Sequence, residues 1–161
     1  MNELVAILPA GEEHLEAAAD IAVEAWTPIR GIFRRDLGGE LYEAFFSGWE
    51  ERKRSDVIRE LTAGRGYVAV LNGRVVGFIS YFADEERKIG IIGTNAVDKS
   101  CRGKGIGQAL YRFIQDRMRS EGLLFAQVTT GGDDGHAPAR RAYERAGFER
   151  SLPSVCYYKK L

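Results

Sequence analysis

The sequence predicts an α+β fold with α/β/α layers. We expect a central mixed, mostly antiparallel sheet of six to seven strands, flanked by about four helices. Three observations support this. Short apolar runs are bounded by Gly, Pro and Asn-Gly turns. Apolar stripes at helical spacing lie before and after those runs. The chain has 161 residues, of which 45% are hydrophobic and 29% charged, so we expect one globular domain over residues 1–161.

The first 66 residues are predicted to form one strand and a helical block. Leu4–Leu8 reads as a strand, because Pro9 follows an apolar run. Glu12–Trp26 carries a helical apolar stripe, which we expect a break at Pro28 to end. The block is then expected to continue as a second helix, with a third helix or a continuation up to Gly64–Gly66, on the apolar positions Leu41, Phe45, Trp49, Val57, Ile58 and Leu61.

A meander of three antiparallel strands is expected next. Tyr67–Leu71 and Arg74–Phe82 are apolar runs joined by Asn72-Gly73, a pair that tolerates positive φ at both central positions of a hairpin turn. A charged turn leads to a third run, Ile89–Val97.

The rest of the chain alternates helices and strands. The expected elements are a helix from about Gly105 to Ser120, a buried strand Leu123–Thr129, a loop Gly131–Gly135, a helix Ala137–Ala146 ended by Gly147, and one or two closing strands from Phe148 onward that include Val155–Tyr158.

Composition limits the classes of function. Lys+Arg and Asp+Glu number 23 each, so the formal net charge is zero, which argues against nucleic-acid and membrane partners. Cys101 and Cys156 are too few for a disulfide framework or a metal cluster, so we expect reduced thiols and no metal. No secretory signal or membrane span is visible, and we expect a cytoplasmic monomer or homodimer.

The segment Arg102–Gly107, Arg-Gly-Lys-Gly-Ile-Gly, lies between the third meander strand and an amphipathic helix. Glycines let a ligand approach the backbone closely, and the first N–H groups of a helix lack intrahelical partners at its positive end. This combination favours binding of a phosphate or diphosphate. Neither the P-loop spacing nor the dinucleotide spacing is present, because Leu110 occupies the third glycine position of the latter. A glycine-rich turn with solvated basic residues is the structural alternative.

A second motif follows about 40 residues later, in the run from His136 to Phe148. Arg102-x-x-Gly105-x-Gly107 closely resembles the coenzyme A signature of the GNAT superfamily of N-acetyltransferases, and the second motif resembles Asn-x-x-Ala-x-x-x-Tyr-x-x-x-Gly-Phe of the same family, with His136 where Asn is usual. The resemblance implies acetyl-CoA as cosubstrate. It implies that the diphosphate is held by backbone amides of Arg102, Gly103, Lys104, Gly105, Ile106, Gly107 and Gln108, and that the pantetheine arm pairs with Asn95, Ala96 and Val97 and contacts His136 and Ala139.

Tyr143 is the candidate catalytic residue. Acyl transfer from a thioester needs a proton donor for the departing thiolate, and a phenol of pKa about 10 can supply that proton. By resemblance we assign Tyr143 as the general acid; a tyrosine packed against the sheet is the alternative. No general base is apparent. His136 is a candidate for base or relay, and proton removal through ordered water is the default.

The resemblance also implies that the first helical block and the hairpin shape the acceptor pocket. Candidate contacts are Trp26, Arg30, Phe33 and Tyr81, with Arg34, Tyr42 and Phe46 as further possibilities. Basic residues near Pro28 favour an acceptor with a carboxylate or phosphate. The sequence thus indicates transfer of an acetyl group to a primary amine of a small molecule, amino acid or peptide by direct attack in a ternary complex. A non-catalytic acyl-CoA-binding module and a nucleotide-phosphate enzyme remain alternatives.

Overall fold

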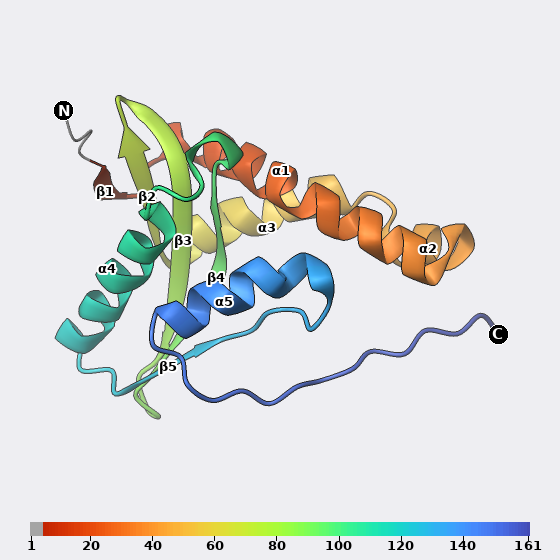
Figure 1. The fold of residues 1–161 in the computed structure, drawn as a ribbon. Coiled ribbons are helices and arrows are strands. Elements are labelled where there is room, and N and C mark those ends of the chain that lie inside the picture. Colours follow the sequence, from red (N-terminus) through yellow and green to blue (C-terminus); the bar gives the residue numbers. More distant parts are fainter. Residues whose placement is uncertain (1–4) are drawn as a thin grey trace.

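A computed structural model describes residues 5–161. Its centre is a five-stranded sheet in which neighbours along the chain are neighbours in space (Figure 1). All pairs are antiparallel except the last, which is parallel. The strands are β1 (Ala6–Pro9), β2 (Arg65–Leu71), β3 (Arg74–Asp84), β4 (Ile89–Val97) and β5 (Phe125–Val128).

Helices cover both faces of the sheet, as the layered α+β prediction requires. Figure 1 shows α1 (Glu12–Leu37) and α3 (Trp49–Ala63) side by side on one face, and α4 (Ile106–Ser120) with α5 (Ala137–Arg145) on the other. The short helix α2 (Gly39–Phe46) follows α1, and two 3-10 turns, η1 (Lys99–Cys101) and η2 (Asp134–His136), precede α4 and α5. No helix within residues 5–161 is long and apolar enough to cross a membrane.

Alternation along the strands produces two cores. On β3, Phe78 packs with the α1 and α3 face, whereas Ile79 and Tyr81 pack with the α4 face. The α4 stripe predicted from the sequence, which includes Leu110 and Ile114, is buried in that second core. The sheet is therefore apolar on both sides, and each face fixes one layer of helices.

The meander forms as predicted. Asn72 and Gly73 have φ values of 51° and 75°, which the right-handed twist of a two-residue hairpin requires. The boundaries of β4 are those expected from the sequence. The N-terminal strand also forms, although Leu4, its first predicted residue, lies outside the described residues.

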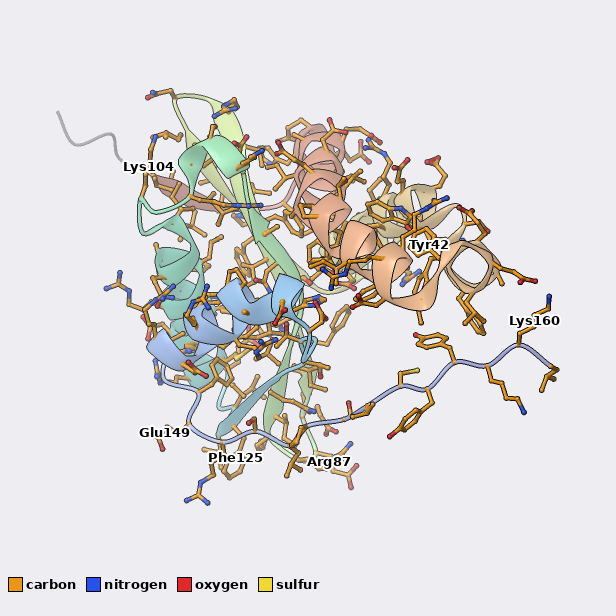
Figure 2. The ribbon with its side chains drawn as sticks, turned by 45° about the vertical axis from the view of Figure 1, so that its right-hand side comes forward. Tyr42, Arg87, Lys104, Phe125, Glu149 and Lys160 are labelled. Carbon is orange, nitrogen blue, oxygen red and sulfur yellow. The ribbon has the colours of Figure 1, made fainter. Side chains whose placement is uncertain are left out.

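The strand count is wrong by one to two, because the predicted closing strands are absent from residues 148–161. Pro153 has no N–H to donate to a ladder, and the segment runs instead towards α2. There Tyr158 packs edge-on against Phe45, with ring centroids 4.9 Å apart, and Lys160 pairs with Glu40. Figure 2 shows this extended path beside the body of the protein.

The predicted buried strand at Leu123–Thr129 is shorter and more exposed than expected. It is an edge strand whose outer side no other strand covers in the described chain, and Phe125 is 65% exposed. The apolar residues of this segment therefore do not indicate a strand that is buried on both faces.

The helix break predicted at Pro28 is wrong, since α1 continues through it to Leu37. The missing N–H leaves the carbonyl of Glu24 without its helical hydrogen bond, but buried Ile29 anchors the following turn. Packing beyond the proline thus outweighs the local cost.

Gly66 tests the junction between α3 and β2. A methyl group at this position would lie 2.4 Å from the carbonyl oxygen of Leu61 and 2.7 Å from its Cα. Gly66→Ala is expected to lower the free energy of unfolding by about 1–3 kcal/mol in a denaturant titration, because the backbone must move. Gly132→Ala, which meets nothing within 4 Å, is the control and should change stability by less than about 0.5 kcal/mol. Equal stability of the two variants would contradict this packing.

Candidate functional site

The site begins with an irregularity in β4. Ile79 pairs with Asn95 and Tyr81 pairs with Ile92, so Ser80 of β3 lies opposite two residues, Gly93 and Thr94. Such a bulge bends a strand and leaves a backbone group outside the ladder. The pairing of β4 with β5 also stops at Ile92. Among the described residues, the second half of β4 therefore has no strand partner on the side of β5.

A cleft of about 860 Å³ opens at this point. Helices α1 and α3 line one side, the second half of β4 and the start of α4 line the middle, and η2 with α5 lines the other side. The cofactor residues predicted from the sequence that lie on its wall are Asn95, Ala96, Val97, Arg102, Gly103, Gly105, Ile106, Gly107, Gln108, His136 and Ala139. Tyr143 lines the same cleft.

The start of α4 offers unpaired backbone donors. Gly103 and Gly105 have φ values of 77° and 80°, a region that side chains disfavour, and they turn the chain from η1 into the helix. The N–H groups of the first helical turn have no partner within the helix. Arg102 donates its Nε hydrogen to the carbonyl of Val97 at 3.3 Å, which holds the guanidinium beside the end of β4. This end of the cleft can bind an anion.

Lys104 is the exception among the predicted cofactor residues. It is exposed and does not line the cleft, and in Figure 2 it lies in the turn that precedes α4.

Tyr143 stands in a chain of hydrogen bonds with Asn95 and Tyr111. The Tyr111 hydroxyl donates to Asn95 Oδ1 at 2.8 Å, which fixes the orientation of the amide. Asn95 Nδ2 then donates to the Tyr143 oxygen at 3.0 Å. Because that oxygen accepts from Asn95, the Tyr143 hydroxyl hydrogen remains available for an acceptor in the cleft. The sequence did not indicate this role for the Asn95 side chain or for Tyr111.

The Tyr143 phenol is held in its protonated form. Burial raises the pKa of this phenol above its ordinary value of 10, and this outweighs the effects of the Asn95 amide and the neighbouring Tyr111 hydroxyl, which favour the phenolate. A proton donor that stays protonated at neutral pH results.

His136 makes its contact with Asp133. Its Nδ1 lies 2.6 Å from Asp133 Oδ2, and since a carboxylate only accepts, Nδ1 carries the hydrogen. In the neutral ring Nε2 then has a lone pair, which can accept a hydrogen bond at the cleft wall. Sequence reasoning named His136 but not this partner.

Glu60 of α3 is the main site residue that the sequence did not reveal. Its Oε2 accepts from the Thr94 N–H at 2.6 Å and from the Ser80 hydroxyl at 3.1 Å, and its Oε1 accepts from the Thr94 hydroxyl at 3.1 Å. Glu60 thus takes the backbone donor that the bulge leaves outside the ladder. Its side chain also lines the cleft.

A model of the acetyltransferase (GNAT) family matches residues 35–148. The chain belongs to this family. Among curated proteins, an N-acetylaspartate synthetase of Xenopus tropicalis is 31% identical over 83 residues. That match covers 52% of this chain and 30% of the relative, so the chain spans about a third of the relative's length.

Solved structures share the fold of this GNAT chain at low identity. PaiA N-acetyltransferase from Thermoplasma acidophilum, in complex with coenzyme A, has a TM-score of 0.71 at 17% identity, over 94% of this chain and 93% of its own. AAC(6')-Iy, in complex with a bisubstrate analogue, has a TM-score of 0.68 at 15% identity, over 98% and 99%. The ribosomal-protein-S18-alanine N-acetyltransferase from Escherichia coli has a TM-score of 0.66 at 18% identity, over 92% and 80%.

The predicted acceptor residues of this GNAT chain separate into three groups. Trp26 lines the cleft. Arg30 and Phe33 lie outside the lining and stack on each other, with the guanidinium carbon 5.3 Å from the ring centre. Tyr81 lies away from the cleft, because strand alternation turns it to the opposite face from Ser80; it is fully buried and donates to Glu121 at 2.9 Å.

The remaining possibilities lie away from the cleft wall as well. Arg34 pairs with Glu43 and stacks on Tyr42, and Phe46 packs beside Phe33 with ring centroids 5.5 Å apart.

The hydrogen-bond chain through Asn95 predicts coupling between two tyrosines. Tyr111→Phe and Tyr143→Phe should each destabilise the protein, and the double variant should lose about 1 kcal/mol less than the sum, because each hydroxyl contributes through the amide orientation that the other supports. Urea denaturation of the four proteins measures this coupling. Tyr157→Phe, at a side chain 90% exposed, should combine additively with either variant. Full additivity of the buried pair would show that Asn95 does not connect them.

Proposed function

We propose that this chain is an acetyl-CoA-dependent N-acetyltransferase, which transfers the acetyl group to a primary amine of a small molecule, amino acid or peptide by direct attack in a ternary complex. The observation that carries the proposal is the Tyr143 hydroxyl, which keeps a hydrogen to donate and lies on the same cleft as the open amides of α4.

Cosubstrate binding is supported by two features at the C-terminal end of β4. The diphosphate of acetyl-CoA matches the backbone donors of the first turn of α4, with Arg102 beside them. The pantetheine arm carries amides, and the stretch from Gly93 to Val97, which has no strand partner on the side of β5, can pair with them as a strand does. PaiA N-acetyltransferase, which shares this fold, is described in complex with coenzyme A.

The proposed transfer is a single displacement. The neutral amine attacks the thioester carbonyl carbon, the C–S bond breaks, and Tyr143 gives its proton to the departing thiolate. The phenol has a raised pKa, so the proton moves to the thiolate only as negative charge develops on sulfur, and solvent then restores the phenol. The amine must lose one proton, and the Glu60 carboxylate at the bulge of β4, directly or through a water molecule, is the proposed acceptor.

A non-catalytic acyl-CoA-binding module is the alternative. It would use the α4 amides but has no need for a tyrosine that retains its hydrogen in the cleft, nor for a carboxylate at the bulge. The similarity to an N-acetylaspartate synthetase favours an enzyme, and among acceptors it favours amino acids.

Gly107→Asp tests the anion site. A side chain fits here, because a Cβ would meet only Val97 Cγ2 at 3.7 Å. An acidic residue in the first turn favours the helix, so thermal stability should be kept or raised, while repulsion of the diphosphate should weaken binding of coenzyme A by at least about tenfold in calorimetry. Gly107→Asn is the uncharged control of similar shape and should lose much less. If both variants bind coenzyme A like the unaltered protein, the diphosphate lies elsewhere.

Tyr143→Phe tests the acid role. With any amine that releases free thiol from acetyl-CoA, kcat should fall by roughly 10²–10⁴-fold, because the proton donor is gone. The Kd for acetyl-CoA should stay unchanged, and Tyr157→Phe should behave like the unaltered protein in both assays. Unchanged kcat would remove Tyr143 from the mechanism. If no amine in a broad panel releases thiol while acetyl-CoA binds tightly, the binding module is the better description.

A further inference from the structure

The wall of the cleft formed by α3 carries two opposite charges. Lys53 and Glu60 are seven residues apart, which is two helical turns, so both lie on the same face of α3, and both line the cleft. Trp26 of the neighbouring helix α1 also lines the cleft, and its ring lies beside Lys53. The anion site of α4 is elsewhere along the cleft, so this pair belongs to the acceptor end.

Glu60 retains capacity for one more donor. Each carboxylate oxygen has two lone pairs. Both lone pairs of Oε2 are used, by the Thr94 N–H and the Ser80 hydroxyl, whereas Oε1 accepts only from the Thr94 hydroxyl among the described residues. An amine has the N–H groups that the remaining site accepts, and it would be held there beside the bulge of β4.

Lys53 has no carboxylate within ion-pair distance in the described part of the chain. Its Nζ lies 4.2 Å from the centre of the Trp26 ring. Burial lowers the pKa of this ammonium, and the nearby charge of Arg30 lowers it further, against the weaker opposing effects of Glu60 and Asp56. The position therefore holds a partly buried cation whose charge is not neutralised by the protein.

Arg30 is a second cation of this kind. Its guanidinium stacks on Phe46 at 4.8 Å and on Trp49 at 5.4 Å from the ring centres. Its Nε is buried and has no hydrogen-bond partner within residues 5–161. Burial also lowers the pKa of Arg30.

Most other basic residues of the same helices are paired with carboxylates, and Arg52 donates instead to the carbonyl of Ser47. On α3, Arg54 binds Glu16 and Asp20, and Arg59 binds Asp56. Two adjacent cations without a counter-ion cost free energy unless an anion joins them.

We propose that the acceptor carries a carboxylate as well as its amine, that the carboxylate binds Lys53 with Arg30 close behind, and that the amine is held at Glu60. This proposal deepens the proposed function and rests on it. The two charges of α3 would fix the direction in which the acceptor enters, with its amine towards Tyr143.

Matched pairs of amines test this acceptor class. The probes are aspartate, 4-aminobutanoate and 6-aminohexanoate. Each is compared with the compound in which every carboxylate is replaced by a carboxamide. The assay measures thiol release with saturating acetyl-CoA. For the best acceptor of the panel we expect the carboxylate to exceed its amide in kcat/KM by about tenfold or more, since a charge-assisted contact is lost in the amide. Equal or better activity of the amide would overturn the proposal.

Lys53→Met tests whether Lys53 causes the preference for the carboxylate over its amide. It should raise KM for the carboxylate by about tenfold with little change in kcat, and leave the amide unaffected, because the contact is made equally in ground and transition states. Lys53→Glu should reverse the preference within the pair. Arg59→Met, on the same helix but on its exposed and paired side, is the control and should resemble the unaltered protein for both acceptors. An equal loss for carboxylate and amide in Lys53→Met would overturn the proposal.

Glu60→Gln examines the amine end. Activity should fall for carboxylate and amide alike, with the Kd for coenzyme A unchanged and the denaturation midpoint showing whether the bulge still folds. If activity with both acceptors is unaffected, Glu60 does not hold the amine.

Failure of the proposed function gives a different result. If coenzyme A binds but no panel member releases thiol, calorimetry with the three carboxylates in the presence of coenzyme A tests the anion site directly. Binding that Lys53→Met abolishes and Arg59→Met keeps would support the site without the reaction, and absence of such binding would overturn it.

Discussion

The hydrogen bond from the Thr94 N–H to the Glu60 carboxylate is the interaction on which the site depends. The bulge in β4 leaves this N–H outside the ladder, and an unpaired buried donor would be costly. A helix on the neighbouring face satisfies it. Gly93 is necessary for this arrangement, because a Cβ there would lie 2.5 Å from Ser80 Oγ and 2.6 Å from Glu60 Oε2. Because Gly93 has no side chain, the Glu60 carboxylate and the Ser80 hydroxyl can approach the bent strand closely.

The shape of the cleft follows from the same bend. The parallel pairing with β5 ends at Ile92, immediately before the bulge, and β4 continues to Val97 paired with β3 alone. The chain then turns through η1 into α4, whose first amides open into the cleft. The free edge of a strand and the free end of a helix therefore lie next to each other. Both expose backbone groups, so what this side of the cleft can bind depends little on side chains.

The sequence predicted the features that local chemistry determines. Asn72-Gly73 fixes a hairpin turn, Gly103 and Gly105 mark a turn into a helix, and the amphipathic stripe of α4 defines which side is buried. Tyr143 was predicted from a motif within the short run from His136 to Phe148, and it lines the cleft. Each of these signals is contained in about fifteen consecutive residues.

Features that depend on distant contacts were missed. Glu60 and Thr94 are 34 residues apart, and α3 is so polar that its periodicity does not reveal which face meets a cleft. Tyr81 is an aromatic residue of a kind common in pockets, yet alternation along β3 turns it to the α4 face, where it donates to Glu121. The prediction of closing strands was wrong for a related reason. Val155 and Tyr157 have strand propensity, but a strand forms only where the edge of a sheet lies at pairing distance. The segment contacts α2 instead.

Net charge hides the electrostatic organisation of the cleft. The chain is neutral overall, yet the cleft wall carries the positive end of α4, the carboxylate of Glu60 at the bulge and the cation Lys53, with Arg30 outside the wall near Lys53. Charges at this spacing inside a partly buried site interact more strongly than the same charges on an open surface. A ligand is then selected by the order of its own charges, and in the proposed function that order is anionic diphosphate, amine, carboxylate. In the proposed function, positive and negative charges that cancel in the net charge of the chain therefore orient both substrates in the cleft.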